Sequence, residues 1–447
     1  MKVDKGFYKR VAILTFPIVI QNVLDSAVNM ADVLMLNQVG QSSISAVSLA
    51  TQITSLFFWF LFGAGTGMTM MGSQYWGKGN IGAINRSLGI ANKYTLFFSG
   101  LSALLCLICP TLLMRIYTPD PELIKMGALY LRLFAPGIIA WGLSYTFLAA
   151  VRSAGRVTIC TITETITLIL NVGLNAFFIF GLNMGAGGVA IATALARIIE
   201  LLICIFISLR SPDIKLIPKY IFQTDRVLER DFKGMCFPAI ANDFIWGLAF
   251  SMFSVILGHR SSDAVAANAI VTVVRNLGCV FSYGIAGATG IILGQLLGAG
   301  KVEQAIYESR ILLLLATLAG AFGGLLIFLF TPLISAGANL TETAHDYLLF
   351  MLHVNAFYIM GTSINTPLIA GIFRAGGNSR FGLKVDTISM WCWAVPAGFI
   401  AAFVLKLDIK LVYLVLCTDE FVKMPTVFKY FFSNKWAKNI TRDNLEE

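Results

Sequence analysis

Charged residues are scarce in this sequence. Only 13% of its 447 residues are Asp, Glu, Lys or Arg, against about 25% in an ordinary soluble chain. Hydrophobic residues make up 57%, and the mean hydropathy is +0.78. This balance excludes a soluble globular protein and predicts a polytopic membrane protein. The net charge of +9 would favour nucleic-acid binding in a soluble chain. Here the basic residues lie between apolar runs, so we expect a lipid bilayer and no nucleic acid as partner.

Motifs for catalysis and for metal binding are also missing. The three histidines, His259, His345 and His353, are isolated and form no HExxH or HxxxH pattern, so we expect no metal site. No GxSxG and no phosphate-binding Walker loop occurs, so we expect no catalytic residues, no cofactor and no ATP hydrolysis. The eight cysteines show no pairing pattern. Cys106 and Cys109 form a CxxC inside an apolar run, which is typical of cysteines packed as small hydrophobes.

Long apolar runs fill most of the chain. A helix needs about 20 residues to cross the hydrocarbon core of a bilayer. The runs predict twelve such helices, six on either side of a polar stretch at 210–233. The predicted spans lie at about 11–36, 45–72, 88–114, 125–150, 158–181, 187–209, 235–258, 264–296, 309–332, 343–372, 384–405 and 411–432.

The two halves of the chain repeat each other. Phe16-Pro17 recurs as Phe237-Pro238, and Gln74 of SQYWGKGN recurs as Gln295 of GQLLGAGK at the same offset. VRSAG at 151–155 recurs as FRAGG at 373–377, at an offset only one position longer. Because each unit holds six spans, the second copy enters the membrane in the same orientation as the first. We therefore expect an all-α protein of two parallel six-helix bundles around a V-shaped central cavity. The expected parts are an N-lobe at 1–209, a cytoplasmic linker at 210–233, and a C-lobe with a cytoplasmic tail at 234–447.

Basic residues are concentrated on one predicted side of the membrane. That side carries the N-terminus, the 210–233 stretch, the short basic loops and the C-terminal tail, in which we place Lys423. The positive-inside rule then predicts a multi-pass protein of the cell membrane with both termini in the cytoplasm.

Two carboxylates lie inside the first apolar run. Gln21, Asp25, Asn29 and Asp32 follow one another at helical spacing and share one stripe of a helix. A charged side chain at the centre of a bilayer costs at least about 2.5–3.5 kcal/mol. The stripe should therefore face the protein interior or water, and we interpret it as the ion-coupling site of a transporter.

Further ionisable residues fall within later spans. Asp243 and Arg275 form a possible polar site in the C-lobe, where the two side chains would pair. Glu164 and Asp386 occupy equivalent positions in the two repeats, and each follows a basic loop. We expect Glu164 to bind Arg152 and Asp386 to bind Arg374. Arg197 and Glu200 have the i, i+3 spacing of a local salt bridge.

Several segments together resemble the multidrug and toxic compound extrusion (MATE) family over essentially the whole chain. They are FPIVIQNVLDSAVNMADVLMLNQVG, SQYWGKGN with GQLLGAGK, VRSAGR with FRAGGNSR, and NVGLNAFFIFGLNMGAGGVAIATALA. The resemblance implies two six-helix bundles facing a central cavity. It also implies export of amphipathic, often cationic, compounds in exchange for protons or sodium ions.

The resemblance also implies site residues. Asp32 matches the aspartate of the family's first helix, and Asn171, Asn175 and Thr193 match its polar partners on the fifth and sixth helices. Asp25 is an additional acid that would contribute to the same site. Pro17 matches the proline that bends the first helix, and we assign it as a hinge.

Two positions depart from the family's pattern. Many relatives carry an aspartate where this chain has Asn175, and the glutamate of one branch falls at Trp246, one turn after Asp243. The loss of a carboxylate at Asn175 removes a charged ligand that a sodium ion prefers. We therefore favour H+ over Na+ as the coupling ion.

The expected function is that of a secondary antiporter, active as a monomer, that exports amphipathic and cationic small molecules by alternating access. The alternative is a flippase or exporter of lipid-linked saccharides from the same superfamily. Such a protein needs a basic cavity for an anionic headgroup, and few basic residues other than Arg275 fall inside the spans.

Overall fold

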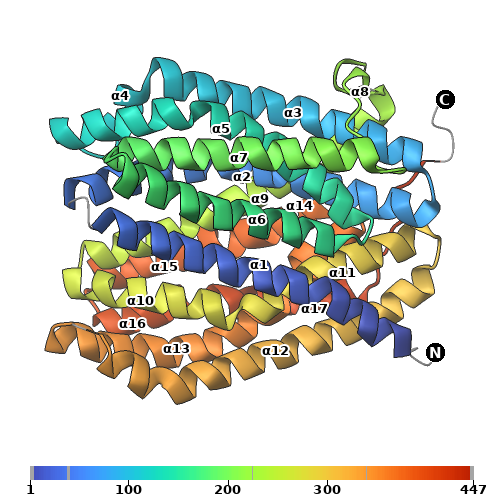
Figure 1. Cartoon of the computed structure of the whole chain (residues 1–447). Coiled ribbons are helices and arrows are strands. Elements are labelled where there is room, and N and C mark those ends of the chain that lie inside the picture. The colour runs from blue at the N-terminus through green and yellow to red at the C-terminus, as the bar shows by residue number, and fades with distance from the viewer. Residues whose placement is uncertain (1–4, 38–40, 224, 339, 443–447) are drawn as a thin grey trace. The chain divides into compact units, whose positions relative to one another are not determined.

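The structure is a computed structural model that describes residues 5–37, 41–223, 225–338 and 340–442. Within these ranges the side chains at 5, 26, 29–34, 36, 37 and 41 are not described. Every regular element in the described ranges is helical, and none of them is a strand (Figure 1).

The first repeat consists of long, mostly continuous helices. They are α1 (Lys5–Asn37), α2 (Gln41–Lys78), α3 (Ile81–Ile108), α4 (Pro110–Arg115), α5 (Pro121–Ser153), α6 (Val157–Ala176) with the π-helical turn η1 (Phe177–Gly181), and α7 (Gly185–Arg210). A short helix, α8 (Lys219–Phe222), lies in the stretch that joins the repeats.

The second repeat is interrupted more often. It consists of α9 (Arg226–Gly258), α10 (Ser262–Gly278), α11 (Val280–Gly298), α12 (Val302–Ala336), α13 (Glu342–Thr366), η2 (Pro367–Phe373), α14 (Ser379–Asp386), η3 (Thr387–Ala394), α15 (Val395–Phe399), η4 (Ile400–Val404), α16 (Ile409–Leu416) and α17 (Asp419–Phe432). The elements η2, η3 and η4 are π-helical, a geometry that is rare and frequently marks functional sites.

Eleven helices in the described ranges are long and apolar enough to cross a membrane. The predicted span at 264–296 is not one helix, because it breaks at Cys279 between α10 and α11. The span predicted at 411–432 is α16 and α17, separated at residues 417–418. With this interrupted span included, the chain is a bundle of twelve transmembrane spans.

Glycines in left-handed conformation repeat at the offset seen in the sequence. Gly79 (φ 79°) precedes α3, and its equivalent in the second repeat, Gly300 (φ 74°), precedes α12. Gly155 (φ 81°) and Gly377 (φ 76°) form a second equivalent pair and precede α6 and α14. A side chain is strained at such φ values. The repeat is therefore preserved in the turns as well as in the helices.

The chain divides into two compact units. One, called the N-unit here, comprises residues 20–240 and 442–447, and the other, the C-unit, comprises residues 1–19 and 241–441. The boundary in α1 falls shortly after Pro17, and the boundary in α9 falls shortly after Pro238. Proline in a helix removes one backbone hydrogen bond. Each of these two helices therefore passes from one unit to the other next to a weakened turn.

In the N-unit, α5 is the central helix. It contacts α2, α3 and α7, and α7 runs beside it in Figure 1. Its buried face includes Leu131, Phe134 and Ile138. The helix starts with two favourable signals, because the Asp120 side chain accepts a hydrogen bond from the Glu122 amide and Pro121 occupies the first turn.

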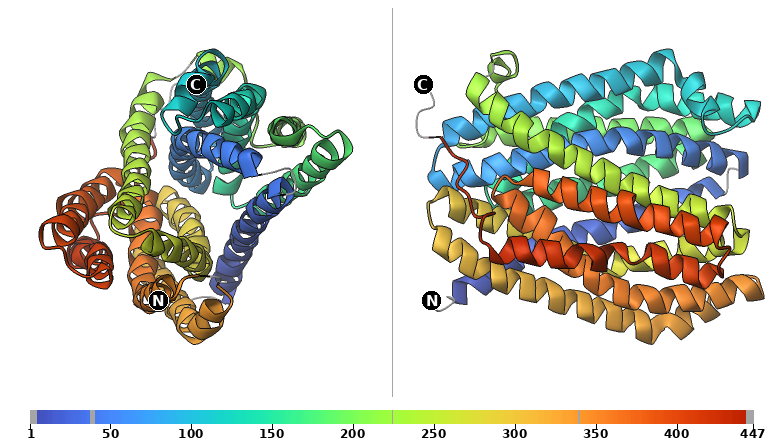
Figure 2. Two further views of the ribbon diagram at one scale, coloured as in Figure 1. Left: turned by 90° about the vertical axis from the view of Figure 1, so that its left-hand side faces the viewer. Right: turned by 180° about the vertical axis from the view of Figure 1, so that it is seen from behind.

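In the C-unit, α12 runs beside α13, as Figure 2 also shows. Two glycines of α12 make this close approach possible. A Cβ atom on Gly320 would lie 2.2 Å from the Ser363 Cβ, and one on Gly324 would lie 2.3 Å from the Ala356 carbonyl oxygen. Glycine at such crossings lets helix backbones pack together where no hydrophobic effect drives them.

Candidate functional site

Three of the predicted site residues come together inside the N-unit. Asn171 and Asn175 lie one turn apart on α6, and the Asn175 Nδ2 donates to the Asn171 Oδ1 over 3.4 Å. The Asn171 Nδ2 donates to the Thr193 Oγ1 on α7 over 3.3 Å. Both asparagines are buried. The spacing of α6 and its packing on α7 thus place a chain of three neutral polar side chains within the bundle.

The acids of the first helix are described only in part. Asp32 lies on α1, but its side chain is outside the described residues, so its place relative to the Asn171 cluster stays a prediction. Asp25 is half-buried, and its charge interacts with those of Arg197, Glu200 and Arg152. Asp25 therefore lies on α1 within electrostatic range of the charged residues of α5 to α7.

Two ion pairs accompany Asp25 in the N-unit. The Arg152 Nη2 lies 3.1 Å from the Glu164 Oε1, as predicted. The Arg197 Nη1 lies 2.7 Å from the Glu200 Oε2, which confirms the predicted i, i+3 pair. The Arg197 guanidinium also stacks on the Trp141 ring, 4.7 Å from its centre. Each half-buried arginine of this group has a carboxylate partner, as the cost of removing an unpaired charge from water requires.

The C-unit arranges its charges differently, and two predicted pairs are wrong. Asp243 does not bind Arg275. Its two oxygens accept hydrogen bonds from Arg374, at 2.6 and 3.2 Å. Arg374 is thereby unavailable to Asp386, which instead lies 3.0 Å from the Lys423 ammonium and accepts a hydrogen bond from the Asn242 amide at 2.9 Å. The bidentate geometry of the Arg374 pair explains why Asp243 is the preferred partner.

Helix α17 contributes charges that the sequence analysis did not assign to a site. Lys423 lies 2.9 Å from the Glu420 Oε1, and Glu420 also accepts from the Asn365 amide at 2.7 Å. Lys423 is only 4% exposed, so its assignment to the charged tail is wrong. The i, i+3 spacing of Glu420 and Lys423 inside the apolar stretch LCTDEFVKMPTVF was the available signal.

Carboxylates outnumber cations in this C-unit network. Asp419 is fully buried, and its Oδ2 accepts a hydrogen bond from the Tyr358 hydroxyl at 3.4 Å. No hydrogen-bond partner within the described residues reaches its Oδ1. Four carboxylates and two cations make up this C-unit network: Lys423 pairs with Asp386 and Glu420, Arg374 pairs with Asp243, which neighbours the Asn242 that binds Asp386, and Asp419 has no ion-pair partner among the described residues. The carboxylates of this group thus exceed its cations by two.

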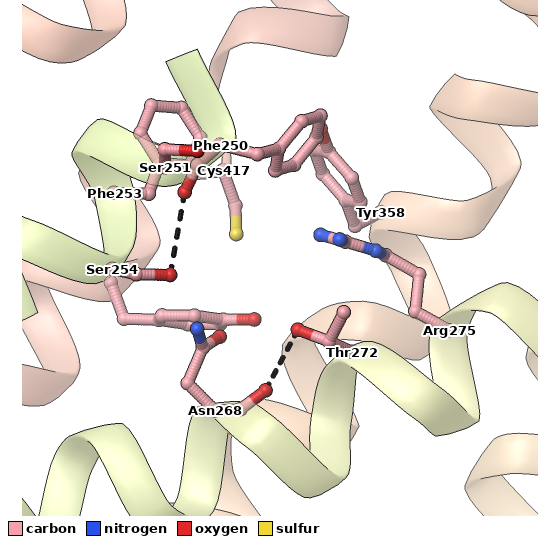
Figure 3. A pocket seen from close by; sticks show the side chains of 10 residues that line it. Phe250, Ser251, Phe253, Ser254, Asn268, Thr272, Arg275, Tyr358 and Cys417 are labelled. Carbon is pink, nitrogen blue, oxygen red and sulfur yellow. Dashed lines mark hydrogen bonds between the residues drawn. The ribbon is translucent and has the colours of Figure 1, made fainter. Parts of the chain in front are cut away.

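Arg275, the second residue of the predicted C-lobe site, lines a separate cavity of about 210 Å³ in the C-unit (Figure 3). It lies in the last turn of α10, and its guanidinium stacks on the Phe250 ring at 4.4 Å. Tyr358 connects this cavity with the C-unit network of charges, because its side chain lines the cavity while its hydroxyl donates a hydrogen bond to Asp419.

Comparisons with known proteins agree with the internal repeat. The MatE family profile matches residues 17–177 and again 238–400, so its two matches begin at Pro17 and at the equivalent Pro238. A probable multidrug resistance protein NorM of Thermotoga maritima is 24% identical over 97% of this chain and 94% of its own length. An uncharacterized transporter of Bacillus subtilis, YisQ, is 26% identical over 95% of this chain and 94% of its own length.

Solved structures share the fold. A MATE family multidrug resistance transporter of the MOP superfamily, solved in an outward-facing conformation, superposes with a TM-score of 0.87 at 18% identity. The superposition covers 99% of this chain and 100% of that chain. The profile matches most of the sequence, in two copies at the offset of the structural repeat. The chain is therefore a multi-pass membrane protein that belongs to the MatE family, the multidrug and toxic compound extrusion transporters.

Proposed function

We propose that this protein is a secondary antiporter that exports amphipathic, cationic small molecules in exchange for protons. The observation that most supports the proposal is the buried chain of Asn171, Asn175 and Thr193 in the N-unit. The two asparagines are buried side by side in a membrane bundle, where unneeded polar groups are costly. With Asp32 and Thr193, they are the residues that the resemblance to the family assigns to cation coupling.

In the proposed mechanism, Asp32 is the main switch and Asp25 contributes negative charge. An ionised carboxylate prefers wet surroundings and a protonated one tolerates dry surroundings. A proton on Asp32 therefore biases the equilibrium between inward-open and outward-open states. A substrate cation and a proton compete for the same negative site, so binding of one releases the other. This competition produces antiport without a long pathway between distant sites.

We propose H+ rather than Na+ as the coupling ion because the N-unit cluster is neutral. Hard cations prefer charged oxygen ligands, and Asn175 supplies only an amide where many relatives have a carboxylate. For the conformational change we propose bending at Pro17, since α1 passes between the two compact units next to this residue. The excess of basic residues at the termini and in the 210–233 stretch favours cytoplasmic termini, and we propose a monomer.

The flippase alternative requires several free cations inside the spans to hold an anionic headgroup. In the described spans, Arg152, Arg197 and Arg374 each bind a carboxylate. Lys423 lies between two carboxylates as well. Arg275 has no carboxylate partner among the described residues, but one such cation does not make a strongly basic cavity, so the pairing of the others favours an exporter of cations.

The proposal is tested by transport of ethidium in proteoliposomes, with a pH gradient and a sodium gradient imposed separately. We expect the pH gradient to drive export and Asp32→Asn to reduce it at least about tenfold. Asp346→Asn, at an exposed carboxylate, is the matched control and should leave export unchanged. Unchanged export by Asp32→Asn would overturn the site assignment. Export driven by sodium alone would overturn the choice of ion.

A further inference from the structure

The cavity beside Arg275 has a polar rim and an aromatic interior (Figure 3). Ser251 and Ser254 of α9 are exposed at its rim, whereas Tyr358, Tyr413 and Cys417 form its buried side. Its volume is about 210 Å³. A protein cavity of about 150 Å³ is already large enough to bind benzene. The cavity therefore has room for one aromatic ring with a small substituent.

Arg275 is unlike three other arginines that are half-buried or buried within the spans. Arg152, Arg197 and Arg374 each have a carboxylate oxygen within 3.1 Å. Among the described residues, no carboxylate forms an ion pair with Arg275 and no acceptor forms a hydrogen bond with it. Its guanidinium instead lies over the Phe250 ring in a cation–π contact. In Figure 3 its guanidinium points into the cavity, below Tyr358.

Among the described residues that line the cavity, Arg275 is the one cation, and Asn268 adds a neutral amide that can donate as well as accept a hydrogen bond. The Ser251, Ser254 and Thr272 hydroxyls each donate to a carbonyl one turn earlier on their own helix. The Tyr358 hydroxyl donates to Asp419. A guanidinium has five N–H donors and no acceptor. An occupant that satisfies the site must therefore supply acceptor oxygens, and it must be anionic to balance the charge.

The walls indicate the rest of the occupant. Phe250, Phe253, Tyr358 and Tyr413 place aromatic rings around the space, and such rings pack well against another ring. We propose that the cavity binds a carboxylate attached to an aromatic ring, with the carboxylate on Arg275 and the ring between Phe250 and the two tyrosines. This inference rests on the proposed function in one respect: it takes the occupant of the cavity to be part of an exported substrate. That substrate would then be zwitterionic, with its cationic end elsewhere.

Binding of three simple probes to the purified wild-type protein tests the proposal without transport. Benzoate has both the ring and the charge, benzamide has the ring without the charge, and acetate has the charge without the ring. We expect calorimetry to show benzoate binding at least about tenfold more tightly than either of the others, because charge-assisted hydrogen bonds are the strong ones. Equal affinities for benzoate and benzamide would overturn the anionic site. Equal affinities for benzoate and acetate would overturn the aromatic part.

Variants assign the binding to Arg275. Arg275→Gln should remove the preference for benzoate over benzamide, and Arg132→Gln, at an exposed arginine of α5, should keep it. Arg275→Lys retains the charge without the planar fork and should show an intermediate preference; it serves as the test if Arg275→Gln does not fold. A preference that survives in Arg275→Gln would overturn the assignment. Since none of these measurements requires transport, failure of the proposed antiport would appear only in the proteoliposome assay.

Discussion

The two repeats carry equivalent charged residues but use them differently. Arg152 and Glu164 of the N-unit bind each other. Their equivalents in the second repeat, Arg374 and Asp386, bind Asp243 and Lys423 instead. The N-unit has Leu201 at the position of Lys423 and polar but uncharged residues at that of Asp243. The two repeats thus share their turns, while Asp243 and Lys423, which have no charged equivalent in the N-unit, provide other partners for Arg374 and Asp386.

The largest loss of stability is expected when the C-unit network loses the cation Lys423, for which the N-unit has no equivalent. Lys423→Met leaves Asp386 and Glu420 buried without their shared ammonium group. Loss of one partner of a buried ion pair typically costs about 3–5 kcal/mol. We expect a decrease of this size in the free energy of unfolding, measured by denaturant titration in detergent with tryptophan fluorescence.

Lys410→Met provides the control for this measurement. Lys410 lies 2.7 Å from Asp346, whose side chain is 62% exposed. A surface pair of this kind contributes little to stability, because water screens the two charges. If the two lysine variants lost equal stability, the C-unit network would not be the tightly linked group that its geometry indicates.

The sequence alone predicted the features that depend on local pattern. Apolar runs located the spans, and a constant offset revealed the repeat, because hydrophobicity and turn glycines can be recognised in short windows. The break at Cys279 was missed because apolar residues continue on both sides of it. The partners of Asp243 and Asp386 were missed because the choice depends on which helices meet. Lys423 was misassigned because a lysine near the end of the last apolar run has the same pattern as a tail residue.

A second comparison concerns the turn that follows α5 in the N-unit and η2 in the C-unit. Ala154 and Gly376 occupy equivalent positions in the two repeats. A Cβ atom on Gly376 would lie 1.7 Å from the Trp436 carbonyl oxygen, because the segment after α17 packs there with Trp436 fully buried. Overpacking usually costs about 1–3 kcal/mol. We expect Gly376→Ala to lower the free energy of unfolding by that amount, and Ala154→Gly to lower it by about 1 kcal/mol or less.

Thermal and denaturant unfolding of the two variants, each compared with the wild type, measures how much stability each substitution removes. If Gly376→Ala were as stable as the wild type, the segment around Trp436 would have to move away at little cost. Its packing would then not be a fixed part of the C-unit.

The smallest effect is expected where the network already has too much negative charge. Asp419→Asn removes one carboxylate charge, and the amide oxygen still accepts the hydrogen bond from Tyr358. Glu420→Gln, by contrast, weakens the contacts with Lys423 and Asn365, and hydrogen bonds to charged groups contribute about 1.5–3 kcal/mol. We expect Asp419→Asn to change the free energy of unfolding by less than about 1 kcal/mol and Glu420→Gln to lower it by more. If Asp419→Asn were the more damaging of the two, the charge of Asp419 would be compensated within the C-unit network. If the two variants differ as expected, Asp419 is the carboxylate of the C-unit network whose charge can be removed at least cost, whereas Glu164 and Glu200 of the N-unit each bind an arginine.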